Sequence, residues 1–255
     1  MQTPKLSVII VSYNSEAFIE KCLTSLQEDE IIVFDNASSD RTIQIIKKFT
    51  NIKLIKSSEN LGFAKANNKA AEEAKGEYLF FLNPDTEVEK PLDELVNFYE
   101  NTPNAGIVGP KLVLENGAIQ PSARKLPTIM GAFKEYILGV KNAYSQYIPG
   151  GKPTEVEMVY GAAILIKKDL FERLGGFDEK FFLYYEDVDL CKRVKNLGKK
   201  IYYYPKVTIK HLVGATKSGM DKNKLNMESA VKYHGKLGAF ILQLIFLIPR
   251  LRRHL

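Results

Sequence analysis

Cysteine is scarce in this 255-residue chain. Cys22 and Cys191 are its two cysteines, and neither belongs to a CxxC pair. This number and spacing indicate neither a disulfide scaffold nor a cysteine-based zinc site, and two isolated thiols fit a reducing cytosol. The N-terminal segment, MQTPKLSVII, also lacks a cationic region followed by a cleavable apolar segment. We therefore expect no signal peptide.

Internal repeats, low-complexity tracts and linkers are likewise missing from the sequence. Apolar residues make up 45% and charged residues 26%, which is close to the average of soluble globular proteins and excludes a disordered chain. The net charge of +6 comes from lysines spread along the chain. This charge favours solubility, and a weaker interpretation is attraction to an anionic membrane surface or to phosphorylated substrates.

Apolar segments rich in β-branched and aromatic residues alternate with helical spacing in the first part of the chain. The predicted strands are Leu6–Val11, Ile31–Phe34, Ile52–Ile55 and Tyr78–Leu82. The helices expected after them are Ala17–Leu26, Arg41–Phe49, Phe63–Ala74 and Pro91–Glu100. Successive strand-to-helix units imply right-handed crossovers. The sequence therefore predicts an α/β fold, a Rossmann-like and mostly parallel central sheet flanked by helices, with polar loops along one edge.

The second part of the chain is less regular. Gly106–Pro110 reads as a short strand, and the stretch 112–153 has poor periodicity, as functional or mobile loops often do. Val156–Ile166 reads as one strand, in which Gly161 marks a bulge or a close approach of two backbones. Lys168–Leu174 reads as a short helix that two glycines stop.

One predicted strand ends in a carboxylate. Tyr78–Leu82 is followed by Asn83, Pro84 and Asp85, and the fixed φ of Pro84 makes the loop sharp and stiff. Ligands of open α/β sheets bind beyond the carboxyl ends of the strands, where Asp85 would lie. Taken alone, the three residues are more typical of a simple turn.

A second acidic pair stands before a predicted helix. Val188, Cys191 and Val194 share one helical face, so we expect a helix to begin near Asp187, with Glu186 and Asp187 at its N-terminal end. The helix dipole there favours ionised carboxylates, which can take a proton. An isolated Glu-Asp pair is also typical of helix capping.

One histidine follows two further predicted strands. Ile201–Tyr204 and Val207–Lys210 read as strands, and the second ends at His211. Neutral imidazole is a good ligand for divalent transition metals, although a single histidine at a strand end more often has a structural role.

Seven motifs together make a more specific pattern. They are VSYNS at Val11–Ser15, DNASSD at Asp35–Asp40, NLGFAKANN at Asn60–Asn68, NPDT at Asn83–Thr86, GGFDE at Gly175–Glu179, YEDVDLCKR at Tyr185–Arg193 and the single His211. Over residues 6 to 218 the chain resembles the inverting glycosyltransferases of family 2, which have the GT-A fold. The NPD form and the motifs NLGFAxANN and EDVDLCxR resemble the rhamnosyltransferase-type branch, which builds bacterial surface polysaccharides.

This resemblance implies transfer of a sugar from a nucleoside-diphosphate donor, with deoxythymidine-diphosphate rhamnose (dTDP-rhamnose) as first choice. The acceptor would be a hydroxyl of a cell-surface polysaccharide or a lipid-linked glycan, and the enzyme would work in the cytoplasm at the inner face of the membrane. Two alternatives stay open: a transferase that uses a uridine-diphosphate hexose, and an inactive module that only binds nucleotide sugars. A nucleotidyltransferase is less favoured, because no Gly-rich phosphate loop follows the first strand. No nucleic-acid partner is implied.

The resemblance also implies roles for individual residues. Asp187 would be the general base, and Asp85 and His211 would hold Mg²⁺ or Mn²⁺. The residues implied for nucleotide-sugar binding are Ser12, Tyr13, Asn14, Asp35, Asn60, Gly62, Asn67, Asn83 and Asp85. Glu186, Arg193 and Gly161 are assigned to the acceptor side. The chain departs from the family pattern at Asn83, where an acid is commoner, and it lacks the QxxRW segment of processive synthases.

The chemistry explains these residue types. Breaking the anomeric bond leaves negative charge on the diphosphate, which a divalent cation between its oxygens stabilises. Attack from the opposite face needs a carboxylate that removes the proton of the acceptor hydroxyl, a contribution of roughly 10²–10⁴ in rate.

We expect a catalytic domain over residues 1–218 and a helical tail over 219–255. The nucleotide-binding half would cover about 1–110 and the acceptor half about 111–218. In the tail, Leu237–Ile248 is strongly apolar but shorter than the roughly 20 residues of a spanning helix. It would either pack on the domain or lie in a membrane interface, with the following arginines near anionic lipid.

Overall fold

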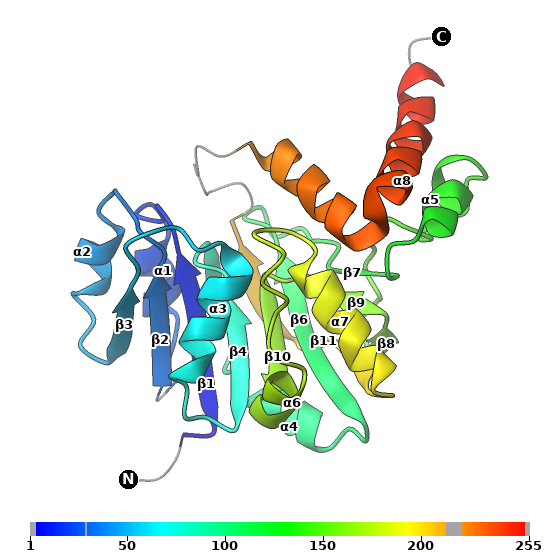
Figure 1. The fold of residues 1–255 in the computed structure, drawn as a ribbon. Coiled ribbons are helices and arrows are strands. Elements are labelled where there is room, and N and C mark those ends of the chain that lie inside the picture. Colours follow the sequence, from blue (N-terminus) through cyan, green and yellow to red (C-terminus); the bar gives the residue numbers. More distant parts are fainter. Residues whose placement is uncertain (1–3, 29, 213–220, 253–255) are drawn as a thin grey trace.

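The computed structural model describes residues 4–28, 30–212 and 221–252, shown in Figure 1. The strands are β1 (Leu6–Ser12), β2 (Glu30–Asp35), β3 (Ile52–Lys56), β4 (Tyr78–Leu82), β5 (Thr86–Val88), β6 (Ala105–Val113), β7 (Ala123–Arg124), β8 (Thr154–Val156), β9 (Met158–Val159), β10 (Ala163–Lys167) and β11 (Lys200–His211). The helices are α1 (Ile19–Thr24), α2 (Thr42–Ile46), α3 (Phe63–Glu72), α4 (Asp93–Glu100), α5 (Ile129–Tyr136), α6 (Lys168–Arg173), α7 (Glu186–Asn196) and α8 (Lys222–Arg252).

The main sheet has the strand order β3-β2-β1-β4-β10-β6-β11-β5, and β8 also pairs with β11. The first four strands of this order are parallel to one another. Every residue of β1 and β4 is buried, as expected for strands covered on both faces. Their carboxyl ends meet at one edge, so the predicted α/β fold and its parallel half are confirmed.

The other half of the sheet is mixed. Strand β10 runs antiparallel to β4 and to β6, while β11 is parallel to β6. Strand β5 pairs antiparallel with the end of β11, and this register sets His211 opposite Thr86. A histidine at the end of one strand thereby comes next to the loop that carries Asp85.

Helices cover both faces of the sheet (Figure 1). Helices α3, α6 and α7 pack on one face, where Phe81 of the central strand meets Phe171 and Phe177 at ring-centroid distances of 4.9 and 5.0 Å. Helices α1, α2 and α4 pack on the opposite face. Because each strand contributes alternate side chains to the two cores, the sheet is held rigidly from both sides.

Helices α5 and α8 pack on each other beside the sheet, at the upper right of Figure 1. Their shared core contains Ala132, Tyr144, Leu242 and Ile245. Gly235, with φ of 75°, interrupts the helical backbone of α8 and divides it into two segments. The apolar helical tail predicted from the sequence is therefore present, and its C-terminal segment lies against α5.

Three predictions for the second part of the chain were wrong. Ile201–Tyr204 and Val207–Lys210 are not separate strands, because both belong to β11, whose pairing with β6 is irregular between Tyr204 and Thr208. Val156–Ile166 forms three separate strands, because β8 pairs with β11, β9 with β7 and β10 with β4 and β6. A turn at Gly161 and Ala162 redirects the chain before β10. The irregular stretch 112–153 contains helix α5, whose first turn is capped by Thr128 Oγ1, the acceptor for Gly131 N–H at 2.9 Å. The predicted domain boundary at 218 lies outside the described residues.

Candidate active site

A cavity of about 480 Å³ lies at the carboxyl edge of the parallel strands. Most of the residues singled out in the sequence line it. They are Tyr13, Asn60, Gly62, Asn83, Asp85, Gly161, Glu186, Asp187 and His211. The first five come from loops that follow the parallel strands. Of the last four, Gly161 precedes β10, Glu186 and Asp187 begin α7, and His211 ends β11. Segments far apart in the chain thus form one cavity.

Asp85 and His211 face each other in this cavity. Nε2 of His211 lies 3.5 Å from Oδ1 of Asp85, and both side chains are buried. Nδ1 of His211 lies 2.8 Å from Oε1 of Gln120. An amide oxygen only accepts hydrogen bonds, so Nδ1 donates. In the neutral imidazole the lone pair then lies on Nε2, the ring nitrogen that faces Asp85. Gln120 therefore fixes the imidazole in the tautomer that can bind a cation next to Asp85.

Asp187 stands at the start of α7, against the turn before β10. Its Oδ2 accepts a hydrogen bond from Gly161 N–H at 3.0 Å, and its Oδ1 accepts one from Val188 N–H at 2.8 Å. Burial raises the pKa of Asp187 above its ordinary value, although these two bonds and the charge of Arg124 oppose the shift. A Cβ at Gly161 would lie 3.1 Å from Oδ2, so glycine permits this close approach.

Glu186 is also buried, 6% exposed, and among the described residues no group lies within hydrogen-bond distance of its Oε2. Burial raises its pKa well above the ordinary value, and the neighbouring charge of Asp187 adds to the shift. The expectation that the helix terminus stabilises both ionised carboxylates was therefore wrong in direction. Loss of water around a buried charge outweighs the favourable helix dipole.

Two loops close the side of the cavity where the sequence predicted the nucleotide. Gly62 has φ of 81°, and a Cβ there would lie 2.6 Å from the carbonyl oxygen of Phe182. Phe63 N–H donates to that same oxygen at 2.6 Å. Asn36 joins the loops, because its Nδ2 donates to Asn60 Oδ1 at 2.8 Å and its Oδ1 accepts from Leu61 N–H at 2.8 Å.

Several predicted residues support the loops and do not line the cavity. Asp35 is fully buried, and its carboxylate accepts hydrogen bonds from Ser12 Oγ and Ser38 N–H, both at 3.0 Å. Asn14 Oδ1 accepts from Ser39 N–H at 2.8 Å. Asn67 Nδ2 donates to Phe63 O at 2.9 Å, one turn earlier in α3.

Arg193 likewise has a supporting position and does not line the cavity. Its Nε donates to Asp189 Oδ2 at 2.6 Å, and its Nη1 donates to Leu174 O at 3.0 Å. These bonds tie α7 to the end of α6.

Other lining residues were missed in the sequence. Arg124, Tyr160, Tyr184 and Tyr185 all line the cavity, and Gln120 supports it through His211. Tyr184 and Tyr185 both have φ of 70°, a strained backbone for non-glycine residues that clusters at functional sites. Tyr185 opens the motif YEDVDLCKR, which could have indicated it. Nothing in the local sequence pattern distinguishes the others, because their positions depend on how the loops pack.

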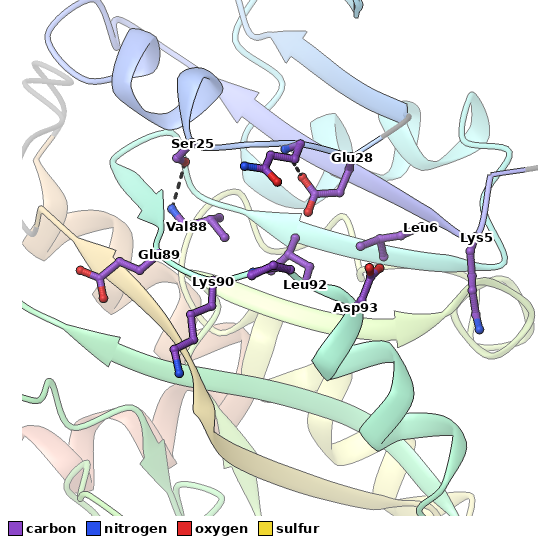
Figure 2. A pocket seen from close by; sticks show the side chains of 11 residues that line it. Lys5, Leu6, Ser25, Glu28, Val88, Glu89, Lys90, Leu92 and Asp93 are labelled. Atoms are coloured by element: carbon purple, nitrogen blue, oxygen red, sulfur yellow. Dashed lines mark hydrogen bonds between the residues drawn. The ribbon is translucent and has the colours of Figure 1, made fainter.

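A smaller cavity of about 280 Å³ lies near the start of β1 and the loop before α4 (Figure 2). Lys5, Glu28, Lys90 and Asp93 give it mixed charge, and Ser25 Oγ accepts from Val88 N–H at 2.9 Å beside it. None of the candidate residues lines this smaller cavity. The cavity of about 480 Å³, at the carboxyl ends of the strands, is therefore the candidate active site.

The sequence was compared with known families and curated proteins. Residues 7–175 match Glycosyl transferase family 2, and residues 148–215 match the N-terminal domain of galactosyltransferase. The N-acetylglucosaminyl-diphospho-decaprenol L-rhamnosyltransferase of Mycobacterium tuberculosis is 28% identical over 234 residues, which cover 82% of this chain and 76% of that protein. Rhamnosyltransferase WbbL of Escherichia coli is 29% identical over 213 residues, with coverage of 78% and 80%.

The fold was compared with solved structures. The mannosyltransferase PcManGT from Pyrobaculum calidifontis, in complex with GDP-Man and Mn²⁺, superposes with a TM-score of 0.60 at 20% identity. The match covers 96% of this chain and 65% of that one. The arrangement of sheet and helices is that of GT-A proteins, as the sequence predicted. The chain belongs to glycosyl transferase family 2, and it is a glycosyltransferase with the GT-A fold.

Proposed function

We propose that this glycosyltransferase is metal-dependent and inverting, and that it moves L-rhamnose from dTDP-rhamnose to a hydroxyl of a cell-surface or lipid-linked glycan. The observation that carries the proposal is the convergence of Asp85, His211 and Asp187 on one cavity at the carboxyl edge of the sheet. The two rhamnosyltransferase relatives, which match over most of their length, support the choice of sugar.

Asp187 is the proposed general base. Its raised pKa makes it a stronger base than an ordinary aspartate, which suits removal of a proton from a sugar hydroxyl. The hydrogen bonds from Gly161 and Val188 hold its carboxylate in one orientation. The buried Glu186 and the Gly161 turn lie on the same side, where we place the acceptor.

Asp85 and His211 fit a divalent cation. Among the described residues, no cluster of three or more His, Cys, Asp and Glu side chains could hold a metal by itself. One carboxylate and one imidazole suit an ion that takes its other ligands from the donor diphosphate and water. Bound there, Mg²⁺ or Mn²⁺ would supply positive charge to the leaving diphosphate. The Mn²⁺ in the PcManGT complex supports this part of the proposal.

We assign the nucleotide to the loops of residues 1–110 and the acceptor to residues 111–218, with 219–255 as the tail. Asn60, Gly62 and Tyr13 line the cavity on the nucleotide side. Asp35 supports the loops on that side, because its carboxylate accepts hydrogen bonds from Ser12 and Ser38. Asn83 carries no charge, so we assign it to the sugar or ribose and not to the metal.

The tail is the proposed membrane contact at the cytoplasmic face. Within the described residues, Lys222–Ile248 is the one helix long and apolar enough to cross a membrane. Leu237 and Phe240 are 73% and 55% exposed on it. Its packing on α5 and the break at Gly235 favour an interfacial position over a spanning one.

A panel of nucleotide sugars tests the donor assignment. The purified chain is heated with dTDP-rhamnose, UDP-glucose, UDP-N-acetylglucosamine or GDP-mannose, each with and without Mn²⁺. We expect the largest increase in Tm with dTDP-rhamnose and Mn²⁺ together, because a ligand that binds the native state stabilises it by mass action. A larger increase with a uridine-diphosphate sugar would favour the hexose alternative. Binding without metal-dependent donor hydrolysis would favour the inactive module.

Substitution of the proposed base tests the mechanism. Asp187→Asn should lower kcat by roughly 10²–10⁴ and leave donor affinity within about twofold, since the base acts on the acceptor. Asp169→Asn, an exposed change on α6, serves as the control and should retain full activity. Transfer at the parental rate by folded Asp187→Asn protein would contradict the assignment.

A further inference from the structure

A second large cavity, of about 750 Å³, lies between α5 and the two segments of α8. Aromatic and aliphatic side chains form most of its wall, among them Tyr136, Tyr144, Leu242 and Phe246. Phe246 contacts Tyr136 and Tyr144 at ring-centroid distances of 5.1 and 5.5 Å. Among the described residues, no carboxylate lines this cavity. Its chemistry suits a long apolar chain.

This α5–α8 cavity adjoins the active-site cavity. Arg124, Tyr185 and Asn226 line both cavities, so these three residues stand at the junction. Tyr185 comes directly before Glu186 and Asp187. Arg124 lies close enough to Asp187 for its charge to lower the pKa of that carboxyl. A molecule in the second cavity can thus present a polar end at the proposed base.

Arg124 brings positive charge to this junction. It belongs to the short strand β7, which pairs with β9, and its guanidinium Cζ stands 4.9 Å from the ring centroid of Tyr144. Its buried Nε has no hydrogen-bond partner among the described residues. A buried donor of this kind is costly to leave unpaired, and a guanidinium matches the geometry of phosphate oxygens.

The outer side of this region is apolar as well. Met130 and Phe133 of α5 are exposed, and so are Leu237, Phe240 and Leu244 on the C-terminal segment of α8. An apolar chain that leaves the cavity on this side would meet an apolar surface of the protein, which suits the interface of a bilayer.

From these observations we propose that the α5–α8 cavity binds the hydrocarbon chain of a lipid diphosphate, and that Arg124 binds its phosphate at the entrance to the active site. The proposal rests on the glycosyltransferase function and names its acceptor: a sugar on a membrane-borne lipid diphosphate. The cavity would hold the chain, and Arg124 would set the distance between the phosphates and the hydroxyl that faces Asp187.

The absence of tryptophan from the chain allows a direct binding measurement. Met227, at the cavity wall and 37% exposed, is replaced in the full chain by Met227→Trp, which provides a single tryptophan that can be excited apart from the tyrosines. The probe is farnesyl diphosphate below its micelle concentration, with farnesol and inorganic diphosphate as comparisons. We expect a saturable change in emission with farnesyl diphosphate, weaker binding of farnesol and no change with inorganic diphosphate. No saturable change with farnesyl diphosphate would overturn the proposal.

Two further substitutions in the Met227→Trp background locate the ligand. Arg124→Gln should weaken farnesyl diphosphate binding about tenfold or more and leave farnesol binding unchanged, because a charged hydrogen bond is lost. Ala239→Leu should weaken both ligands, because it fills the cavity. Arg173→Gln on α6, outside the cavity, is the matched control and should bind as the parent does. Equal farnesyl diphosphate binding in Arg124→Gln and the control would contradict the role of Arg124.

A parallel readout separates this proposal from the proposed function. The Mn²⁺-dependent Tm shift with dTDP-rhamnose is measured in each variant, and Ala239→Leu, which lies outside the active-site cavity, should retain it. Unchanged farnesol binding shows that Arg124→Gln is folded. If no nucleotide sugar shifts the Tm of any variant while farnesyl diphosphate still binds, the donor assignment fails and the lipid site stands. If the donor shift is present and farnesyl diphosphate does not bind, the lipid site alone is wrong.

Discussion

At the scale of single residues, the adjacent carboxylates Glu186 and Asp187 are held in an environment that disfavours their charge. Both lie inside the cavity wall, and burial raises the pKa of each. Aspartate in such a place is a better base at neutral pH than an exposed one. The same burial lowers the free energy of unfolding whenever the groups ionise.

We predict that Glu186→Gln makes the protein more stable at pH 8, by on the order of 1 kcal/mol. The folded-state pKa of Glu186 lies above its ordinary value of 4.5, so the native state binds the proton more tightly than the unfolded state. The contribution of Glu186 to the free energy of unfolding is therefore fully present below pH 4.5, and it is lost as the pH rises through the folded-state pKa. Urea unfolding of parent and variant between pH 4 and 8 measures the difference.

The control for this prediction is Glu115→Gln, a change at an exposed carboxylate. It should leave the pH dependence of the unfolding free energy as it is in the parent. If the free energy of unfolding of Glu186→Gln follows the parent curve at every pH, ionisation of Glu186 in the folded protein does not cost stability, and the prediction is wrong.

Gln120 would affect metal binding indirectly, through its hydrogen bond to His211. Because it holds the tautomer of His211, we predict that Gln120→Leu lowers the affinity for Mn²⁺ by roughly 10–100-fold. The measurement is a titration of Mn²⁺ against the Tm of the protein with saturating dTDP-rhamnose. Affinity for the nucleotide sugar without metal should stay the same.

Gln27→Leu, at an exposed position before β2, is the matched change for Gln120→Leu. It should show the parental Mn²⁺ titration. If both leucine variants titrate alike, then the bond between Gln120 and His211 has no part in metal binding.

At the scale of elements, the loop between β3 and α3 must pass closely under the segment before α7. We predict that Gly62→Ala costs roughly 1–3 kcal/mol of stability, since alanine is strained at φ of 81° and its Cβ would collide with Phe182. Gly117→Ala is the control, because Gly117 also has a positive φ, 80°, but nothing lies within 4 Å of the added Cβ.

Chemical denaturation of the two alanine variants separates backbone strain from collision. Gly117→Ala should lose about 1–2 kcal/mol through strain alone and keep its affinity for the nucleotide sugar. Gly62→Ala should lose more and bind the donor weakly, because Gly62 lines the cavity. Equal losses in both variants would mean that the contact with Phe182 is not tight.

The elements of the parallel half could be predicted from the sequence, while those of the mixed half could not. Strands β1 and β4 are continuous apolar runs, which report burial on both faces directly. Strands β8, β9 and β10 follow one another within a similar apolar run, yet they pair with different partners. Hydrophobicity alone does not encode the choice of partner, because register and pairing depend on the rest of the sheet.

At the scale of the whole molecule, helices α5 and α8 lie together beside the sheet (Figure 1). Both carry exposed apolar side chains, among them Met130, Leu237 and Phe240. We predict that the protein sediments with vesicles that contain anionic lipid, and less with neutral ones, because arginines follow the apolar segment in the sequence. The double substitution Leu237→Glu with Phe240→Glu should weaken vesicle binding at least about tenfold.

Leu197→Glu, which changes an exposed leucine at the end of α7, is the control for this surface. It should sediment like the parent. Point substitutions are preferable to truncation of the tail, because removal of Leu242 and Ile245 would uncover α5. Equal sedimentation of all variants would exclude α8 as the membrane contact.

The sequence by itself determined the α/β class, the parallel half of the sheet, the family and the apolar tail, because local periodicity and short motifs report these features. It also singled out Asp85, Asp187 and His211, whose roles stay predictions. Only the tertiary structure decided that His211 faces Asp85, that Gly161 holds Asp187 and that Arg124 joins two cavities. These contacts join distant segments through loop packing and mixed strand pairing. Burial, which sets the pKa of Glu186 and Asp187, is likewise a property of the assembled fold.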